Sequence, residues 1–177
     1  MNVICFGDSN TYGYDPRGYF GGRYDADSRW VDILAMETGW TISNIGQNGR
    51  EIPTSVPSFS ADTDLLIVML GTNDLLQGRS SEQAAGRLER FLYGVSMDRS
   101  KVLLIAPPPV TLGAWVSSPQ LIDDSCTFAR LCQTLAERMG IRFADAGKWD
   151  IPLAYDGVHF TEQGHRAFAA GLLEELR

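Results

Sequence analysis

The chain begins with the stretch Asn2–Tyr12, N-V-I-C-F-G-D-S-N-T-Y. Its short apolar run, Val3–Phe6, is broken by Gly7 and followed by polar residues. This pattern is typical of a buried β-strand that delivers a polar turn to one edge of a sheet. Because glycine tolerates conformations that a Cβ would hinder, the chain can turn sharply and present Ser9. A second interpretation stays open, in which Asp8 or Ser9 simply caps a helix.

The composition is that of an ordinary globular protein. The 177 residues are 44% apolar and 21% charged, so we expect a single domain over residues 1–177 with a substantial core. The net charge of −7 argues against a nucleic acid or an anionic membrane as partner. No apolar run approaches the roughly 20 residues of a membrane span. Because the first predicted strand starts at residue 2, we expect no signal peptide and a cytoplasmic location.

The three cysteines, Cys5, Cys126 and Cys132, show no spacing typical of metal ligands. They are best interpreted as free thiols, largely buried, in a reducing compartment. With only two histidines in the chain, we expect neither a metal site nor a cofactor.

Predicted strands and helices alternate along the chain. The most apolar run, Leu65–Leu70, is continuous rather than alternating, as in a parallel sheet that is covered on both faces. The other predicted strands are Trp40–Ile45, Val102–Ala106 and Ile141–Ala144. The predicted helices are Arg29–Thr38, Ser81–Val95, Leu121–Met139 and one that starts after Thr161. This alternation predicts an α/β fold, a three-layer α/β/α sandwich around a flavodoxin-like, mostly parallel sheet of about five strands.

Between the first turn and the first long helix, the segment Tyr12–Asp27 is rich in glycine and tyrosine and lacks periodicity. We expect a surface loop there. Its aromatic residues either line a binding cleft or merely hold the loop in place, and the sequence does not separate the two. These residues are Tyr12, Tyr14, Tyr19, Phe20 and Tyr24.

The strand-to-helix turns are expected to lie together in space. Right-handed crossovers place them all at the carboxyl edge of the sheet, where ligands of such folds bind. The turns that carry Ser9, Gly49 and Asn73 are therefore predicted to share one edge.

A candidate base lies near the end of the chain. His159 follows Asp156 by three residues across a glycine, so a tight turn can bring the carboxylate to the imidazole Nδ1–H. The Nε2 atom is then free to accept the proton of Ser9. The order Ser, Asp, His is that of α/β-hydrolases, although their G-x-S-x-G motif is absent. The other histidine, His165, lies within the last helical pattern and is interpreted as a surface or packing residue.

Acyl transfer also needs hydrogen-bond donors aimed at the oxyanion of the tetrahedral intermediate. The candidates are the Ser9 amide, the Gly49 amide and the Asn73 side chain, and Gly46 competes with Gly49. Asn73 can equally be a turn residue in a left-handed conformation.

Four motifs together resemble those of the SGNH, or GDSL-type, hydrolases, and they occur in the family's order across nearly the whole chain. They are Gly7-Asp8-Ser9, Gly49 after Asn44, Gly71-Thr72-Asn73-Asp74, and Asp156-Gly157-Val158-His159. The resemblance implies the SGNH hydrolase fold, with Ser9 as nucleophile and Asp156 and His159 completing a triad. It also implies an oxyanion hole formed by Ser9, Gly49 and Asn73.

Further stretches are similar to the arylesterase and acyltransferase-like branch of that family. They are Arg29-Trp30, Met69-Leu70, the triple proline 107–109, Asp145-Ala146-Gly147 and Phe160-Thr161. The sequence departs from the family at Asn10, where a leucine is common. We place Asn10, Tyr12 and Trp115 in the substrate-binding region.

These observations predict a serine esterase that cleaves short-chain acyl esters through an acyl-enzyme on Ser9. The expected partner is a small-molecule ester, such as an acetylated carbohydrate or an aryl ester, and a homo-oligomer is compatible with the sequence. One alternative is a lipid acylhydrolase of the lysophospholipase or thioesterase type. Another is a non-catalytic, flavodoxin-like module that binds a phosphate or a flavin, but no Lys or Arg occurs in Gly7–Tyr14 to favour it. A catalytically inactive relative is the third.

Overall fold

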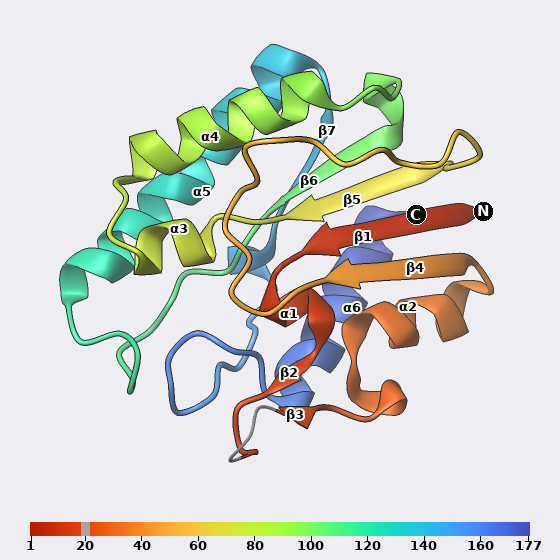
Figure 1. The fold of residues 1–177 in the computed structure, drawn as a ribbon. Coiled ribbons are helices and arrows are strands. Elements are labelled where there is room, and N and C mark those ends of the chain that lie inside the picture. The colour runs from red at the N-terminus through yellow and green to blue at the C-terminus, as the bar shows by residue number, and fades with distance from the viewer. Residues whose placement is uncertain (19–21) are drawn as a thin grey trace.

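A five-stranded parallel sheet forms the centre of the computed structural model, which describes residues 1–18 and 22–177 (Figure 1). Its strands are β1 (Asn2–Gly7), β4 (Thr41–Gly46), β5 (Leu65–Met69), β6 (Val102–Ala106) and β7 (Arg142–Asp145). They lie in the order β4-β1-β5-β6-β7, and every neighbouring pair is parallel. The predicted parallel α/β sheet is confirmed, and each strand starts and ends within one or two residues of its predicted position.

Burial along the strands follows their place in the sheet. All residues of β5 and β6 are buried, because these two central strands are covered on both faces. The edge strand β4 alternates between exposed and half-buried residues. The continuous apolar run Leu65–Leu70 therefore belongs to a central strand, as its pattern predicts.

Helices cover both faces of the sheet (Figure 1). On one face lie α4 (Ser81–Gly94) and α5 (Pro119–Met139), and on the other lie α2 (Trp30–Thr38) and α6 (Glu162–Glu175). Local signals set their ends. Ser80 and Gln83 form a reciprocal capping box at the start of α4, and Gly140 ends α5 in a left-handed conformation.

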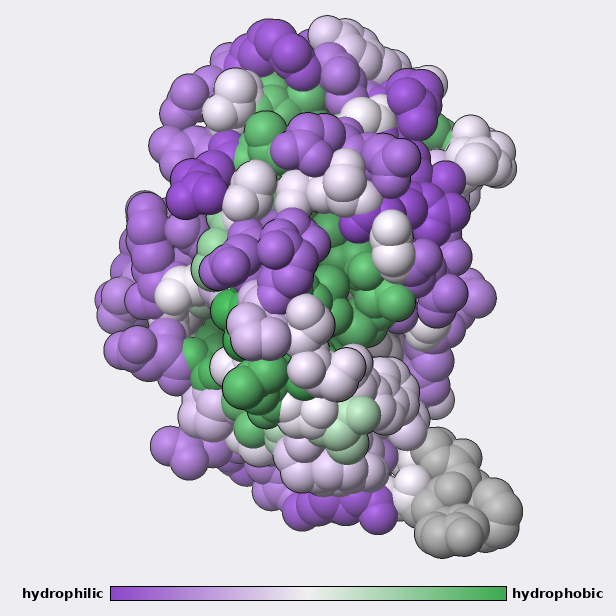
Figure 2. Space-filling view, turned by 90° about the vertical axis from the view of Figure 1, so that its left-hand side faces the viewer, coloured by the Kyte–Doolittle hydropathy of each residue, from purple (hydrophilic) through white to green (hydrophobic). Residues whose placement is uncertain are grey.

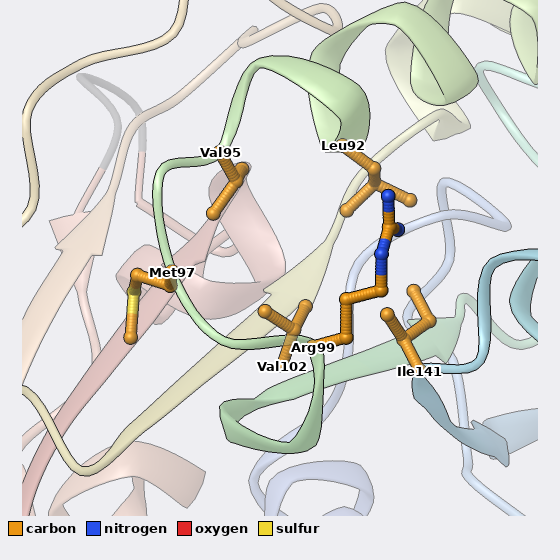
Figure 3. Close-up of a pocket in the computed structure, with 6 residues that line it drawn as sticks. All are labelled: Leu92, Val95, Met97, Arg99, Val102 and Ile141. Carbon is orange, nitrogen blue, oxygen red and sulfur yellow. The ribbon is translucent and has the colours of Figure 1, made fainter.

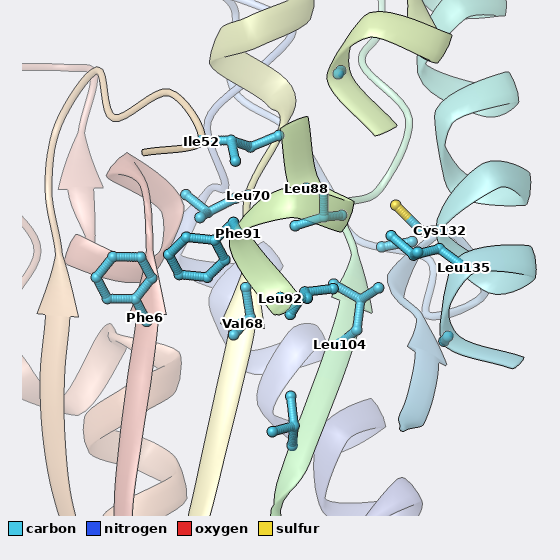
Figure 4. Packing of buried hydrophobic residues seen from close by; sticks show 14 of the residues in the cluster. Phe6, Ile52, Val68, Leu70, Leu88, Phe91, Leu92, Leu104, Cys132 and Leu135 are labelled. Atoms are coloured by element: carbon cyan, nitrogen blue, oxygen red, sulfur yellow. The ribbon is translucent and has the colours of Figure 1, made fainter. Parts of the chain in front are cut away.

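Each face of the sheet packs against its helices through its own apolar core. On the α4 and α5 side, Phe91 stacks on Phe6 of β1 with ring centroids 5.4 Å apart, and Leu88 and Leu104 are fully buried (Figure 4). On the α2 and α6 side, Trp30 lies 4.6 Å from Phe168 between ring centroids. Burying such large side chains on both faces is the main source of stability in this architecture.

The first turn combines both sequence interpretations. The chain leaves β1 and enters a short helix, α1 (Ser9–Tyr12), whose N-cap is Asp8. The Asp8 carboxylate accepts the Asn10 amide at 3.0 Å. A strand thus delivers the polar turn, and an aspartate caps the helix that follows.

The segment Tyr12–Asp27 differs from the predicted surface loop. It contains two short antiparallel strands, β2 (Tyr14–Asp15) and β3 (Gly22–Arg23). The Tyr24 amide also donates to the Gly13 carbonyl at 2.9 Å, which holds the segment against α1. Tyr19 and Phe20, two of the aromatic residues singled out in the sequence, lie outside the described residues.

The remaining short elements are α3 (Thr72–Leu76) and 3₁₀ turns at Ala26–Ser28, Arg99–Lys101 and Ala146–Lys148. None of the helices in the described part of the chain is long and apolar enough to cross a membrane. The cysteines are free, with Cys5 and Cys132 buried and Cys126 half-buried. Burial raises the pKa of the Cys5 and Cys132 thiols well above the ordinary value, so neither is activated as a nucleophile.

A small hollow of about 60 Å³ opens at the amino end of β6 (Figure 3). It is lined by Leu92, Val95, Met97, Arg99, Val102 and Ile141. Because Val102 is the first residue of its strand, this hollow lies at the opposite edge of the sheet from Ser9. It is not part of the site described next.

Candidate active site

Three side chains predicted from distant motifs meet at the carboxyl edge of the sheet. The Ser9 Oγ lies 2.9 Å from His159 Nε2, and His159 Nδ1 lies 2.7 Å from Asp156 Oδ2. Since a carboxylate only accepts hydrogen bonds, Nδ1 carries the proton and Nε2 is free to accept from the serine hydroxyl. All three residues are buried, and Ser9 keeps 5% of its surface exposed.

The Asp156 carboxylate is held in its ionised form. Burial by itself would raise its pKa, but the His159 ring and the amides of Val158 and His159 donate to the carboxylate and outweigh burial. The pKa of Asp156 therefore lies below its usual range. An ionised Asp156 fixes the tautomer of His159 and stabilises the imidazolium when it forms.

The loop around Asp156 is docked on the segment that follows the triple proline. Thr111 N–H donates to the Gly157 carbonyl at 2.9 Å, and Trp115 N–H donates to the Asp156 carbonyl at 3.1 Å. At Gly113 the two backbones approach so closely that a Cβ would collide with the backbone of Asp156. The position of the acid therefore depends on the segment 111–115.

The structure also brings the predicted oxyanion donors to this edge. Ser9 starts α1, Asn73 lies in α3 directly after β5, and Gly49 lies in the loop after β4. One N–H of the Asn73 side chain donates to the Arg50 carbonyl at 3.1 Å, which leaves its second N–H for another acceptor.

The geometry separates Gly49 from its competitor Gly46. The Gly46 amide already donates to Asn44 Oδ1 at 2.9 Å, and a Cβ at this position would collide with the Tyr12 backbone. Gly49 adopts a φ of +70° and has open space beside its Cα. The Gly46 amide is therefore already engaged, whereas the space beside Gly49 is open.

Sequence reasoning missed the charged residues that brace the Gly49 loop. The Arg50 guanidinium donates to the Gly7 carbonyl at 2.9 Å and also to the Ile45 carbonyl, so it joins the ends of β1 and β4. Its side chain also stacks over Phe6, 4.4 Å from the ring centroid. Arg50 was not distinguishable from other surface arginines, because these partners lie in two strands that meet only after folding.

A buried ion pair holds the far end of the same loop. Asp74 is fully buried, accepts the Ile52 amide at 2.8 Å and pairs with Arg87 Nε at 2.8 Å. Arg87 also donates to the Ile52 carbonyl. Asp74 is the last residue of the motif Gly71-Thr72-Asn73-Asp74 and directly follows Asn73. Its place in that motif was therefore a signal in the sequence, but no role was predicted for Asp74 from the sequence.

Aromatic rings flank the histidine. The Tyr14 ring lies 4.6 Å from the His159 ring, and the half-exposed Trp115 ring stands nearly perpendicular to it at 5.0 Å. Of the other cleft candidates, Tyr12 stacks with the Arg23 guanidinium at 4.6 Å. Tyr24 is buried and packs on His165 at 5.4 Å between ring centroids. Tyr14 and Trp115 thus border the site, whereas Tyr24 holds the segment in place.

Asn10 does not fit the predicted contact with substrate. It is buried, its Nδ2 donates to the Val158 carbonyl at 3.1 Å, and its Oδ1 accepts the Phe160 amide at 2.9 Å. Since both ends of the side-chain amide bind backbone, these hydrogen bonds argue against the predicted substrate-binding role of Asn10, which stays a prediction.

The second histidine is a packing residue. His165 is fully buried between Tyr24 and Phe160, and burial lowers its pKa to about 3, so it stays neutral. Of the surface and packing roles that the helical pattern left open for His165, the structure shows packing.

The surface around the carboxyl edge is mixed in character. Figure 2 shows hydrophobic surface in the middle of the face onto which the strand ends open, with hydrophilic residues around it. The exposed apolar side chains of the loops at this edge include Leu112, Trp115 and Tyr155.

A serine hydroxyl bonded to a buried His–Asp pair is the arrangement found in hydrolases that act through serine. A family model described as the GDSL-like lipase/acylhydrolase family matches residues 5–167. The chain belongs to this family and is a carboxylic ester hydrolase. The resemblance found in the motifs is thereby confirmed.

Solved structures agree with this assignment. The chain is 27% identical to the M. smegmatis aryl esterase, with a TM-score of 0.84, over 100% of this chain and 98% of that one. It is 25% identical to a carbohydrate acetylesterase family member from Sinorhizobium meliloti, also with a TM-score of 0.84, over 100% of this chain and 97% of that one. Among curated protein sequences, no relative matches the chain.

The buried carboxyl group of Asp8, next to Ser9, makes a testable contribution to stability. Burial raises the pKa of Asp8 to about 6, although the Asn10 amide and the charges of His159 and Arg50 oppose this rise. The folded state therefore holds a proton that the unfolded chain releases near pH 4, and stability contributed by this group falls as the pH rises from about 4 to about 6.

We predict that Asp8→Asn removes this pH-dependent loss while keeping an N-cap of equal quality. The free energy of unfolding of the variant minus that of the wild type should grow from pH 4 to pH 7, by on the order of 2–3 kcal/mol. Urea denaturation at a series of pH values measures this difference. A difference that stays constant over the range, or shrinks, would contradict the raised pKa.

Proposed function

We propose that this enzyme is a serine esterase that cleaves short-chain acyl esters through an acyl-enzyme on Ser9. The observation that carries the proposal is the continuous hydrogen-bond chain from Ser9 Oγ through His159 to Asp156, with distances of 2.9 and 2.7 Å. A nucleophile, a base and an orienting acid are then aligned before substrate binds.

The first half of the reaction forms the acyl-enzyme. Ser9 Oγ bonds to the acyl carbon while His159 Nε2 takes the hydroxyl proton, and the carbonyl oxygen becomes an oxyanion. When this intermediate collapses, the bond between the acyl carbon and the alcohol oxygen breaks. The departing alcohol receives the proton from His159, and the ester of Ser9 remains.

The second half regenerates the enzyme. Water attacks the acyl carbon and gives a proton to His159, and the bond to Ser9 Oγ then breaks as the serine recovers that proton. The products are one alcohol and one carboxylic acid, and no metal or cofactor takes part in these steps. Throughout, the ionised Asp156 stabilises the imidazolium.

The oxyanion would be bound by the Ser9 amide, the Gly49 amide and the second N–H of Asn73. The bond from Asn73 to the Arg50 carbonyl supports this role, because it couples the Asn73 side chain to the loop that carries Gly49. Donors that are fixed before the reaction stabilise developing charge most effectively.

A small acyl group is favoured by the enclosure of the site. Only 5% of the Ser9 surface is exposed, and the Tyr14 and Trp115 rings border the neighbouring histidine. We propose that these rings contact an aryl or sugar alcohol portion of the substrate. The aryl esterase and carbohydrate acetylesterase among the similar structures support this choice.

A lipid acylhydrolase is the second candidate. The exposed Leu112 and Trp115 on the segment that docks against Asp156 favour it, since they could extend apolar contacts along an acyl chain.

We further propose a cytoplasmic location, supported by the free cysteines.

The first prediction for this function concerns the nucleophile. Ser9→Ala should lower kcat by about 10⁴–10⁶ while leaving the melting temperature nearly unchanged, because only the attacking atom is removed. A fluorophosphonate should label Ser9 in the wild type and nothing in the variant. Ser43→Ala, on the exposed edge of β4, serves as the control and should keep both activity and labelling. Labelling of another serine would refute the assignment.

A second prediction separates an oxyanion role for Asn73 from a turn role. Asn73→Ala should lower kcat by roughly 10²–10³ with little change in KM, because the lost donor acts only in the transition state. If Asn73 merely shapes the turn, the melting temperature should fall while the folded fraction stays fully active. Measuring both quantities on one preparation distinguishes the two roles.

The third prediction concerns acyl length. The values of kcat/KM for nitrophenyl acetate, butyrate, octanoate and palmitate should fall beyond butyrate. A long groove would instead gain about 0.8 kcal/mol for each buried methylene, and kcat/KM would rise with chain length. A maximum at octanoate or palmitate would favour the lipid acylhydrolase.

A further inference from the structure

The side chain of Asn10 binds the backbone on both sides of His159. Its Nδ2 donates to the carbonyl of Val158 at 3.1 Å, and its Oδ1 accepts the amide of Phe160 at 2.9 Å. Both hydrogen bonds are buried, and they link positions 148 and 150 residues apart in the sequence. His159 lies between the two bonded residues.

We propose that Asn10 is a positioning residue that sets the distance between Ser9 Oγ and His159 Nε2 by clamping the backbone on either side of the histidine. The proposal rests on the proposed roles of Ser9 and His159 as nucleophile and base.

The clamp is itself rigidly placed. The backbone N–H of Asn10 donates to Asp8 Oδ1 at 3.0 Å, and the backbone carbonyl of Asn10 accepts the Trp30 indole N–H at 2.9 Å. Asn10 therefore has a partner for its backbone N–H, its backbone carbonyl and both ends of its side chain. Asn10 directly follows Ser9 in the chain. One peptide bond, the Asn10 side chain and its two hydrogen bonds therefore connect Ser9 to the backbone around His159.

Asn10 and Asp156 hold His159 from different directions. Asp156 binds the ring at Nδ1 and also accepts the amides of Val158 and His159. These bonds orient the ring relative to its own loop. Besides the Ser9–His159 hydrogen bond itself, the Asn10 clamp ties that loop to the helix that carries Ser9, so it fixes the separation between the two reacting groups.

The chemistry of the clamp requires an amide. Nδ2 must donate and Oδ1 must accept, and asparagine offers both from a single short side chain. A leucine of similar size offers neither group, and an ionised aspartate keeps the acceptor but turns a repelling oxygen toward the Val158 carbonyl. This requirement accounts for the departure from leucine at this position.

The decisive variant is Asn10→Leu. A base that is misplaced by about 1 Å costs on the order of 10²-fold in rate, so kcat should fall by roughly 10–100-fold while KM stays within about 2-fold. The low-field proton resonance of His159 Nδ1–H should weaken or broaden, because the loop that carries His159 and Asp156 loses its anchor. Asn10→Asp keeps one of the two bonds and should give an intermediate loss of kcat.

The matched control is Asn44→Leu. Asn44 makes the same kind of two-point contact on the other side of α1, donating to the Thr11 carbonyl at 2.8 Å and accepting the Gly46 amide at 2.9 Å. Losing it should lower the melting temperature much as Asn10→Leu does, yet leave the His159 resonance intact. A general effect of losing a side-chain amide with two backbone partners is thereby separated from the loss of the clamp.

The outcomes are distinct. A raised KM with unchanged kcat in Asn10→Leu would make Asn10 a substrate contact and overturn the proposal, as would a folded variant with wild-type kcat and resonance. If Asn10→Leu fails to fold, wild-type kcat in Asn10→Asp overturns the proposal, and a reduced kcat at unchanged KM supports it. If Ser9→Ala keeps full activity, the proposed function fails, whereas the resonance in the Asn10 variants still tests the clamp by itself.

Discussion

The close contact between α1 and the carboxyl ends of β1 and β4 is the constraint on which the rest of the site depends. At Gly7 a Cβ would collide with Thr11 and with the Met69 carbonyl, and at Gly46 it would collide with the Tyr12 backbone. Two glycines thus let the helix sit directly on the strand ends. That placement puts Ser9 at the sheet edge and Asn10 within reach of the last loop.

Around this contact, the loops at the candidate site are held mainly by side chains that bind backbone. Arg50 joins two strand ends, Asp74 and Arg87 hold Ile52, and Asn73 binds the Arg50 carbonyl. Loops lack the regular partners that strands provide for backbone N–H and C=O groups, so polar side chains must supply them. The same hydrogen bonds that stabilise these loops also place the groups that would act on substrate.

The sequence predicted the parallel sheet and the contact between Asp156 and His159 because their signals are local. Continuous apolar runs identified β5 and β6, and the spacing of Asp156 and His159 anticipated their hydrogen bond. The roles of Asn10 and Arg50 were not predictable, because each side chain binds partners that are distant in sequence and meet it only after folding. The strands within Tyr12–Asp27 were missed because two-residue strands carry no periodicity.

The docking of the segment 111–115 on Asp156 and Gly157 has a consequence for how this enzyme can diversify. Since the two backbones touch at Gly113 and share hydrogen bonds on either side, an insertion or deletion there would displace the acid along with the loop. Within this segment, new specificity would therefore arise by exchanging exposed side chains such as Leu112 and Trp115, with the loop length held constant. A library of variants built for altered selectivity should randomise those two positions and keep the number of residues in the segment 111–115 unchanged.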